Sequence, residues 1–503
     1  MCHRTFSTAL AATLLAGCTG FPAPGPSASP HTPATTPAVP SAEPASLTCT
    51  YRGVDVQVVL EPLVRLDETT TALRVRASAD SRVDLGDIWK AGYGWQSSAR
   101  GIRLADLAGE HALESTGADP AVSPLNTGDR PEVVVFFGPA PAGSYTVLVP
   151  LCGAAQVPVI GAEEASEQTR AELGSARGRA KLQPEHGRAA PLATYLTSAD
   201  EGTQTRTTAE TVTFTLDADV TFEYNSDALT PTARDRLRGV AEDLRGLGPG
   251  RVTITGHTDD TGSADHNLDL SKRRAARVHS GLKDLIDLSG YEISVDGKGM
   301  TQPRVPNAND TARAANRRVE IRAEPTAKPK TPAGQGGGQL PEASGPVGTG
   351  AEGVEVKLNG GTTARIALPH VVRRGRHLIG LVEVTGGDPG GTGHPLGQLF
   401  SPRRFQETQR RGHTDRQYWA TTGFTLLRGQ QRVHPTDYVS PSEDADTPLT
   451  ELGAQDPLAA GEKARLLVIW PDLGDETVVL DHVSDPRGLH DVPFRLTDIP
   501  VKG

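Results

Sequence analysis

The stretch GHTDDTGSADHNLDLSKRRA, residues 256–275, follows the strand pattern RVTITG and leads into a helical pattern. Its first half is rich in Asp, Gly and Ser, which predicts a turn between the two elements. Asp259 in this turn supplies a carboxylate that can hold an ammonium group. Arg274 supplies a planar guanidinium that can hold a carboxylate through two parallel hydrogen bonds. The two residues suit the head group of a zwitterionic ligand; a direct ion pair between them is the alternative interpretation.

The residues on both sides of this stretch alternate between strand and helix patterns, which predicts an α/β domain over residues 210–324 with the order βαβαββ. TVTFTL and VTFEY supply the first strand region, and RVTITG, EISVDGKG and RRVEIRA supply the later strands. We expect the first helix to begin after Thr230, with Pro231 at its first position. We expect the second to begin near Ser271 as N-cap, which would place Arg274 in the first turn beside free backbone N–H groups. The buried faces of the two helices are predicted to hold Leu237, Val240, Ala241 and Leu244, and Ala275, Val278, Leu282 and Ile286.

Three motifs occur in this segment in order: GHTDxxG from Gly256, NxxLSxxRA from Asn267 and NRRVEI from Asn316. Together they resemble the OmpA-like peptidoglycan-binding domain, over residues 210–324. The resemblance implies that this domain binds peptidoglycan, with Asp259 and Arg274 gripping the diaminopimelate residue of the stem peptide. The segment GKGMTQP, residues 297–303, departs from the family's usual form, which has an aromatic and an acidic residue there.

Five further residues in or beside these motifs are candidates for the binding site: Thr258, Asn267, Leu268, Asn316 and Arg317. For Asn267, holding the turn is an equal alternative. Phe222 and Tyr224 are candidate walls of the site, with core packing as the alternative. His257 lies beside Asp259 and Asp260, but this set lacks the further ligands that a metal ion needs, so we expect no metal site.

Residues 1–46 carry the patterns of an export signal and a tether. His3 and Arg4 precede an Ala/Leu/Thr stretch that ends in Leu15-Ala16-Gly17-Cys18, the form of a bacterial lipobox. We therefore expect residues 1–18 to be a lipoprotein signal peptide and Cys18 to carry a diacylglycerol; an ordinary signal peptide with a chance cysteine is the alternative. Residues 19–46 are rich in Pro, Ser, Thr and Ala, which predicts a semi-rigid tether.

Residues 47–162 contain short β-branched runs separated by Gly, Pro, Asp and Ser, which predicts a β-sandwich. Cys49 and Cys152 bracket most of this segment. Outside the cytoplasm we expect them to form a disulfide, with two buried free thiols as the alternative.

The patterns of this first β segment recur in order over residues 353–503. The run from Gly101 (GIRL) matches the run from Gly423 (GFTL), and Val157-Pro158 matches Val492-Pro493. Residues 126–129, before EVVVFFGPAPAG, match residues 460–462, before RLLVIWPDLGD. We infer a second, related β-sandwich, with chance similarity between two β-domains as the alternative. Residues 163–209, helical in their first part, and the Pro/Gly-rich residues 325–352 are predicted linkers.

Composition and missing motifs narrow the function. The formal net charge of −10 argues against a nucleic-acid partner, and no apolar run is long enough to span a bilayer. GxSxG and HExxH do not occur, and we expect neither a cofactor nor catalysis. We therefore predict an extracytoplasmic protein, lipid-anchored to the cell membrane or the outer membrane, that ties the membrane to peptidoglycan. An adaptor whose β-sandwiches bind an envelope protein or a ligand is the second hypothesis, and a wall-directed hydrolase is the third.

Overall fold

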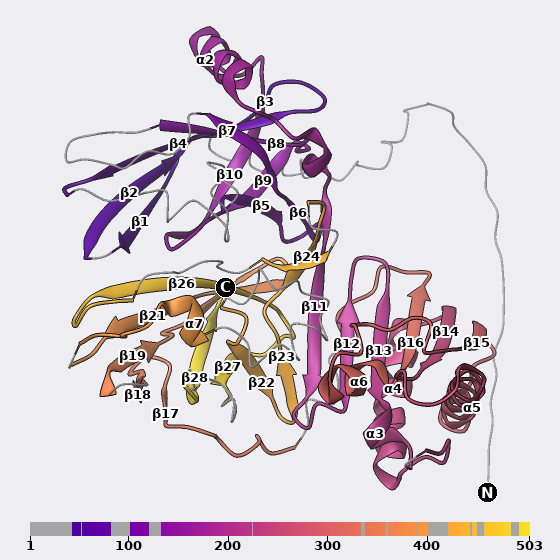
Figure 1. Cartoon of the computed structure of the whole chain (residues 1–503). Coiled ribbons are helices and arrows are strands. Elements are labelled where there is room, and N and C mark those ends of the chain that lie inside the picture. Colours follow the sequence, from indigo (N-terminus) through magenta and orange to yellow (C-terminus); the bar gives the residue numbers. More distant parts are fainter. Residues whose placement is uncertain are drawn as a thin grey trace, which may run out of the picture. The chain divides into compact units, whose positions relative to one another are not determined.

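The computed structural model describes residues 43–51, 53–81, 101–119, 132–223, 225–332, 338–358, 361–388, 390–400, 421–442, 445–449, 457–483 and 492–503 (Figure 1). All of them fall within one unit, residues 40–503. The predicted signal peptide, the lipidation at Cys18, residues 19–42 of the predicted tether, Tyr224 and residues 126–129 lie outside the described residues. Within these ranges, no helix combines the length and the apolar character needed to cross a membrane.

The central domain is an α/β fold around one mixed sheet (Figure 1). The strands lie in the order β12 (Thr203–Thr207), β13 (Val212–Asp217), β16 (Arg318–Pro325), β14 (Gly250–His257) and β15 (Tyr291–Gly299). Only the β14–β15 pair is parallel among them. The helices α4 (Pro231–Leu247) and α5 (Ala264–Lys283) bury their predicted apolar faces in one core with β13, β14 and β16. This confirms the α/β fold expected for the segment.

The first of these helices begins where the sequence predicts, but the second does not. Thr230 caps α4 by accepting a hydrogen bond from the Ala233 N–H, and Pro231 occupies its first position. The helix α5 is capped by Ser263, so it begins at Ala264 and the predicted start near Ser271 is wrong. Ser271 lies inside α5, where its hydroxyl donates to the Leu268 carbonyl at 2.8 Å and accepts from the Gly299 N–H at 2.9 Å.

A close approach between α5 and β14 explains why the residue at position 256 is a glycine. A Cβ atom added to Gly256 would lie 2.1 Å from the Ser271 carbonyl oxygen, a distance that real Cβ atoms do not show. Gly256 therefore lets the helix backbone contact the strand directly. Ser271 is a small residue of α5 at this contact with β14. Because serine is also a common N-cap residue, the sequence analysis wrongly placed the start of the helix there.

Two short helices in this domain were not predicted. The segment VTFEY was expected to be a strand, but α3 (Ala218–Thr221) begins directly after β13, and Phe222 forms an isolated bridge to Leu229. The helix α6 (Asp310–Asn316) ends directly before β16. Asp217 caps α3 and Asn309 caps α6, each by a side-chain oxygen that accepts a backbone N–H. Both helices are shorter than the windows over which apolar periodicity is informative.

The segment predicted as the first linker is largely ordered. Its first part forms the helix α2 (Glu167–Arg179), as expected. Its second part forms a 3-10 turn (Pro184–Gly187) and two strands, β11 (Ala190–Ser198) and β12, rather than linker. The strand β11 pairs with β12 and also with β6 (His111–Leu113), β23 (Gln431–Val433) and β24 (Asp437–Ser440). One strand of this segment therefore joins the central sheet to both flanking regions.

The first β-region, residues 45–161, has one antiparallel series in the order β1 (Ala45–Tyr51), β2 (Val54–Leu60), β4 (Thr71–Ala79), β8 (Glu132–Phe137) and β7 (Ser115–Asp119). A short strand, β3 (Leu63–Arg65), pairs with β4 and in parallel with the last strand of the region. From there the order is β10 (Gly153–Gly161), β9 (Gly143–Val149), β5 (Arg103–Asp106) and β6. The predicted disulfide between Cys49 and Cys152 is present and closes this region across 103 positions.

The second β-region, residues 347–502, repeats this connectivity except for β7, which has no counterpart among the described strands. Its antiparallel series is β18 (Val354–Lys357), β19 (Thr363–Ala367), β21 (His377–Gly386) and β26 (Lys463–Pro471). The short strand β20 (Val371–Arg374) pairs with β21 and in parallel with the last strand of the chain. From there the order is β28 (Phe494–Lys502), β27 (Thr477–His482), β22 (Thr425–Arg428) and β23. The remaining elements are β17 (Val347–Thr349), within the second predicted linker, α7 (Leu396–Phe400), β24 and β25 (Ala445–Pro448).

The strand registers fix which residues of the two regions correspond. The sequence match of Gly101 with Gly423 makes Thr425 the counterpart of Arg103. Arg103 pairs with Leu148 and Thr425 pairs with Asp481, so Asp481 is the counterpart of Leu148. Leu148 pairs with Ala154 and Asp481 pairs with Arg495, so Arg495 is the counterpart of Ala154. Val492 and Pro493 precede Arg495, whereas Val157 and Pro158 follow Ala154, so the predicted match of these two pairs is wrong. The recurrence of the same pairings supports a duplication. That each region is a β-sandwich stays a prediction.

One apolar face of the strands β4 and β8, and the corresponding face of β21 and β26, are covered by different elements. In the first region, Ala72, Val134 and Phe136 are buried together with Leu173 and Ala176 of α2. The corresponding residues of the second region, Ile379, Leu467 and Ile469, share an apolar cluster with Ala105, Ala112, Leu148 and Leu192 from β5, β6, β9 and β11. A helix therefore covers the face in one region, whereas strands of the first region and β11 cover it in the other.

Candidate functional site

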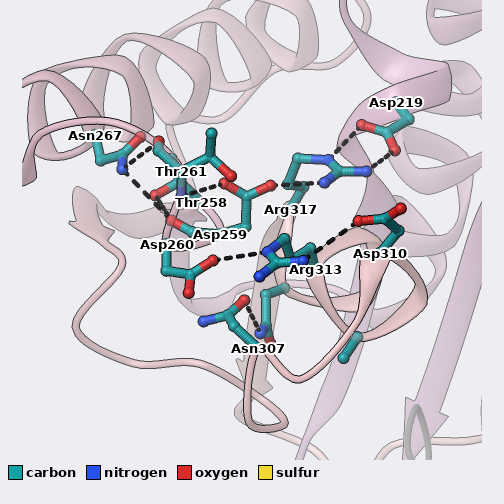
Figure 2. Close-up of polar contacts among 12 residues, drawn as sticks. Asp219, Thr258, Asp259, Asp260, Thr261, Asn267, Asn307, Asp310, Arg313 and Arg317 are labelled. Carbon is teal, nitrogen blue, oxygen red and sulfur yellow. Dashed lines mark hydrogen bonds and ion pairs between the residues drawn. The ribbon is translucent and has the colours of Figure 1, made fainter.

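Asp259 lies in the turn directly after β14, where the sequence predicts it, and it is held by two hydrogen bonds. Its Oδ2 accepts from Arg317 Nη1 at 2.6 Å, and its Oδ1 accepts from the Thr261 N–H at 2.9 Å (Figure 2). Burial alone would raise the pKa of this carboxyl, but the bonds from Arg317 and Thr261 together lower it below its usual range. Asp259 is therefore an ionised carboxylate at neutral pH, with further lone pairs on both oxygens to accept a ligand.

Arg317 follows α6 and links Asp259 to a residue that sequence reasoning missed. Its Nε donates to Asp219 Oδ1 at 2.7 Å, and its Nη2 bonds the other oxygen of the same carboxylate, so the two groups pair side-on (Figure 2). The hydrogen bond to Asp219, and then that to Asp259, raise the pKa of Arg317, although burial opposes them. Arg317 thus carries a permanent positive charge between two carboxylates from α3 and from the turn after β14.

Arg274 lies in the middle of α5, so the predicted help from free N–H groups at a helix start is absent. It does not pair with Asp259. Its Nε donates to the Ser226 carbonyl at 3.0 Å, and its guanidinium lies 5.1 Å above the ring of Phe222. The residue is only 6% exposed, yet its two terminal amino groups have no hydrogen-bond partner among the described residues. Burial lowers the pKa of Arg274, but an arginine remains charged because its pKa starts above 12.

The other predicted residues divide into those that face the ligand space and those that support it. Asn267 donates to the Thr261 carbonyl at 3.0 Å and more weakly to the Asp259 carbonyl, so it holds the turn as well as lining the site (Figure 2). Thr258 is buried beside Asp259 and also lines the site. Asn316 is fully buried and anchors the loop before α6: it accepts from the Arg304 and Val305 N–H groups and donates to the Val305 carbonyl. Leu268 is exposed and does not line the site.

These side chains surround a cavity of about 470 Å³. Its walls come from α3 and the loop after it, the turn after β14, one face of α5, and α6. Phe222 forms part of the wall, as the sequence suggested. Arg313 of α6 is a further lining residue that the sequence did not indicate; its Nε donates to Asp260 at 2.9 Å (Figure 2). The cavity thus places an ionised carboxylate and a guanidinium with free donors in one enclosed space. In the part of the chain that the structure describes, no group of acidic, histidine or cysteine side chains could hold a metal ion.

A buried ionic cluster beneath the site makes the stability of the central domain depend on pH. Although burial opposes it, Glu320 has its pKa lowered from 4.5 to about 2 by Arg318 and Arg304, and burial lowers the pKa of His257 from 6.5 to about 4. Both pKa values are depressed in the folded state, so the unfolded chain binds these protons first as the pH falls. Each group is expected to contribute up to about 3 kcal/mol that is lost on acidification, His257 between about pH 6.5 and 4 and Glu320 between about pH 4.5 and 2.

Amide hydrogen exchange of β14 and β16 measures this loss locally. In the wild type we expect protection to fall steadily below about pH 6. A His257→Asn variant should be less stable at pH 7 but should show a flatter pH dependence between pH 6.5 and 5. An unchanged slope in that variant would contradict the assignment of this proton to His257.

Comparison with known proteins identifies the domain that carries this site. Residues 221–317 match the OmpA family. This segment is an OmpA family domain. The resemblance predicted from the three motifs is therefore confirmed, and all the residues described around the cavity, apart from Ala218 and Asp219 at its edge, lie inside the match.

Relatives of the OmpA family domain include named envelope proteins. An outer-membrane lipoprotein of Pseudomonas aeruginosa is 34% identical over 108 residues, 22% of this chain and 64% of that protein. The peptidoglycan-associated lipoprotein of the same organism is 37% identical over 101 residues, 20% of this chain and 59% of that protein. A peptidoglycan-binding protein of Mycobacterium tuberculosis is 38% identical over 102 residues, 20% of this chain and 31% of that protein. The chain spans less than two thirds of the length of each of these relatives.

Solved structures also match part of this chain. The cell wall anchor of the T6SS from P. aeruginosa is 27% identical and covers 25% of this chain and 90% of its own, with a TM-score of 0.23. The periplasmic domain of Helicobacter pylori MotB is 25% identical and covers 25% of this chain and 84% of its own, also with a TM-score of 0.23.

Proposed function

We propose that this protein binds peptidoglycan non-covalently through its OmpA family domain, by gripping the diaminopimelate residue of the stem peptide in the cavity between α3, α5 and α6. One observation carries the proposal: Arg274 is buried at the cavity wall with its two terminal amino groups unpaired among the described residues, opposite an ionised Asp259. The guanidinium is held in place at Nε by the Ser226 carbonyl, while its two amino groups line the cavity, which favours a ligand that completes their hydrogen bonds.

The chemistry of diaminopimelate fits this arrangement. The end of its side chain carries an ammonium and a carboxylate on one carbon. The carboxylate would accept two hydrogen bonds from Arg274, and the ammonium would donate to Asp259, whose charge is maintained by Arg317 and Thr261. Thr258 and Asn267 would shape the wall around the bound group. Relatives named as peptidoglycan-associated and peptidoglycan-binding proteins support peptidoglycan as the polymer that is bound.

Weak binding at one such site is sufficient if the protein is held beside the wall. Peptidoglycan is a polymer that presents many copies of the ligand, and we propose that a lipid on Cys18 and the tether of residues 19–46 keep the domain at its surface. Effective concentrations in the millimolar range then make a weak contact productive. In this proposal the protein is an extracytoplasmic, lipid-anchored link between membrane and wall, without catalysis.

The two β-regions account for most of the remaining chain. We propose that they are β-sandwiches related by duplication, as the repeated strand pairing supports. The adaptor hypothesis assigns them an envelope protein as partner. Retention of such a partner by a chain that no longer binds peptidoglycan would distinguish this role from wall binding.

Sedimentation of the full chain with purified peptidoglycan sacculi tests the wall-binding proposal. We expect the chain to sediment with sacculi, and we expect a soluble stem peptide that contains diaminopimelate to compete. The matched control is the same peptide with lysine in place of diaminopimelate, since lysine keeps the amine and lacks the side-chain carboxylate; it should compete at least about tenfold less well. Failure to sediment, or equal competition by the two peptides, would overturn the proposal.

A further inference from the structure

Asp219 lies at the edge of the cavity and pairs with Arg317, and the geometry of that contact is specific. The carboxylate of Asp219 takes the Nε and Nη2 side of the guanidinium, which leaves Nη1 to reach Asp259 at 2.6 Å (Figure 2). Arg317 is therefore bound side-on by Asp219 and only end-on by Asp259. Because a side-on pair uses two parallel hydrogen bonds, it is the stronger of the two and sets the orientation of the guanidinium.

The backbone around Asp219 fixes this carboxylate in place. Asp217 caps α3 by accepting from the Asp219 N–H at 2.9 Å, and the Ala218 N–H donates to the Arg317 carbonyl at 3.0 Å. The start of α3 is thus bonded to the very residue whose side chain Asp219 holds. Asp219 also remains half-exposed at the edge of the cavity, whereas Asp259 is buried.

Among the charged residues that line the cavity, Asp219 and Asp259 are negative and Arg274 and Arg317 are positive, so these four groups sum to zero. The lining also holds Glu223, Asp310 and Arg313, which together add one negative charge. The four-group set suits a ligand head group that is itself neutral overall, with one charge of each sign. Without Asp219, Arg317 would retain Asp259 as its only carboxylate partner among the described contacts, and the four-group set would become positive. Arg317 would then neutralise Asp259, and the site would favour a simple carboxylate.

We infer that Asp219 is a specificity-determining residue of the cavity: by holding Arg317 side-on, it keeps Asp259 free to accept a ligand ammonium, so that the site selects a zwitterionic amino-acid head group over a plain carboxylate. This inference rests on the proposed function and names what selects the substrate within it. Asp219 acts through Arg317 and need not contact the ligand.

The test compares two peptides on the full chain by isothermal titration calorimetry. One is a stem peptide with free diaminopimelate, and the other is the same peptide with its side-chain amine acetylated. The wild type should bind the free amine about tenfold or more tightly than the acetylated form. In an Asp219→Asn variant this ratio should fall to near one, with affinity for the acetylated peptide equal to or higher than that of the wild type. A general loss of structure would weaken both peptides together and would not move the ratio.

An Asp269→Asn variant is the matched control. Asp269 also pairs with an arginine, Arg273 of α5, but it does not line the cavity, and Arg273 has a second carboxylate in Asp227, so the ratio should stay at the wild-type value. An Asp219→Asn variant with the wild-type ratio would overturn the inference while leaving the proposed function intact. A wild type that binds neither peptide nor sacculi would overturn the proposed function and this inference with it.

Discussion

An Arg274→Ala variant of the full chain is expected to stay folded and to bind peptidoglycan sacculi at least about tenfold more weakly than the wild type. Among the described residues its guanidinium makes one hydrogen bond, to the Ser226 carbonyl, and it stacks on Phe222. The remaining donors are available to a ligand carboxylate, and hydrogen bonds to charged groups contribute about 1.5–3 kcal/mol each. The loss should therefore appear in the dissociation constant from a sedimentation isotherm rather than in the thermal midpoint.

Two further variants separate charge from geometry. Arg274→Lys keeps the positive charge but replaces the planar fork by a single ammonium, so we expect intermediate binding. Arg273→Ala removes the neighbouring arginine, which pairs with Asp269 of α5 and with Asp227 of the loop before α4, and should bind like the wild type. Wild-type sedimentation of Arg274→Ala, or an equal loss in Arg273→Ala, would contradict the placement of the ligand carboxylate.

The sequence placed Asp259 after a strand and Arg274 on a helix, as the structure has them, because short motifs tie these residues to those elements. It misplaced the start of the helix by taking Ser271 as its N-cap. Ser263 and Ser271 are both good capping residues, and the choice between them depends on Gly256, whose missing Cβ lets α5 lie against β14. That contact joins residues from two elements, and a pattern along one element does not contain it.

The partner of Asp259 could not be predicted for a similar reason. The sequence analysis gave an ion pair between Asp259 and Arg274 only as the alternative to ligand binding, and the structure places Arg317 beside Asp259 instead. The side-on contact between Arg317 and Asp219 joins residues 98 positions apart, and Asp219 stands in a short helix that the sequence assigned to a strand. Apolar periodicity predicts which faces are buried; it does not predict which charges meet across a sheet.

The recurrence of strand patterns was visible in the sequence, and most of the strand pairings recur in the structure, but the residues that differ between the two regions are informative only in the structure. The first region has Ala112, Leu148 and Ala154 at positions that pack toward the second region. The second region has Arg432, Asp481 and Arg495 at the corresponding positions. Apolar packing in one region is therefore replaced by a buried ion cluster in the other.

This cluster leads to the largest stability effect that we expect in the chain. Asp481 accepts from Arg432 at 2.6 Å and from Arg495 at 2.7 Å, and its side chain is 3% exposed. Removing one member of a buried ionic group leaves its partners charged, desolvated and unpaired, at a cost of about 3–5 kcal/mol. An Asp481→Leu variant should lower the free energy of unfolding of the second β-region by this amount, measured by hydrogen exchange of β27 and β28, without weakening peptidoglycan binding.

Replacing the whole cluster should be far less harmful than removing its centre. In the triple variant Arg432→Met, Asp481→Leu and Arg495→Met, no buried charge is left unpaired, and the methionines keep most of the arginine volume. The first β-region already carries apolar residues at the corresponding positions, which shows that this strand arrangement accepts them. We therefore expect the triple variant to recover most of the stability that Asp481→Leu loses, a strongly non-additive result. If the triple variant is destabilised as much as Asp481→Leu or more, the expectation is wrong. The intact ion cluster would then be more stabilising than apolar residues at the same positions.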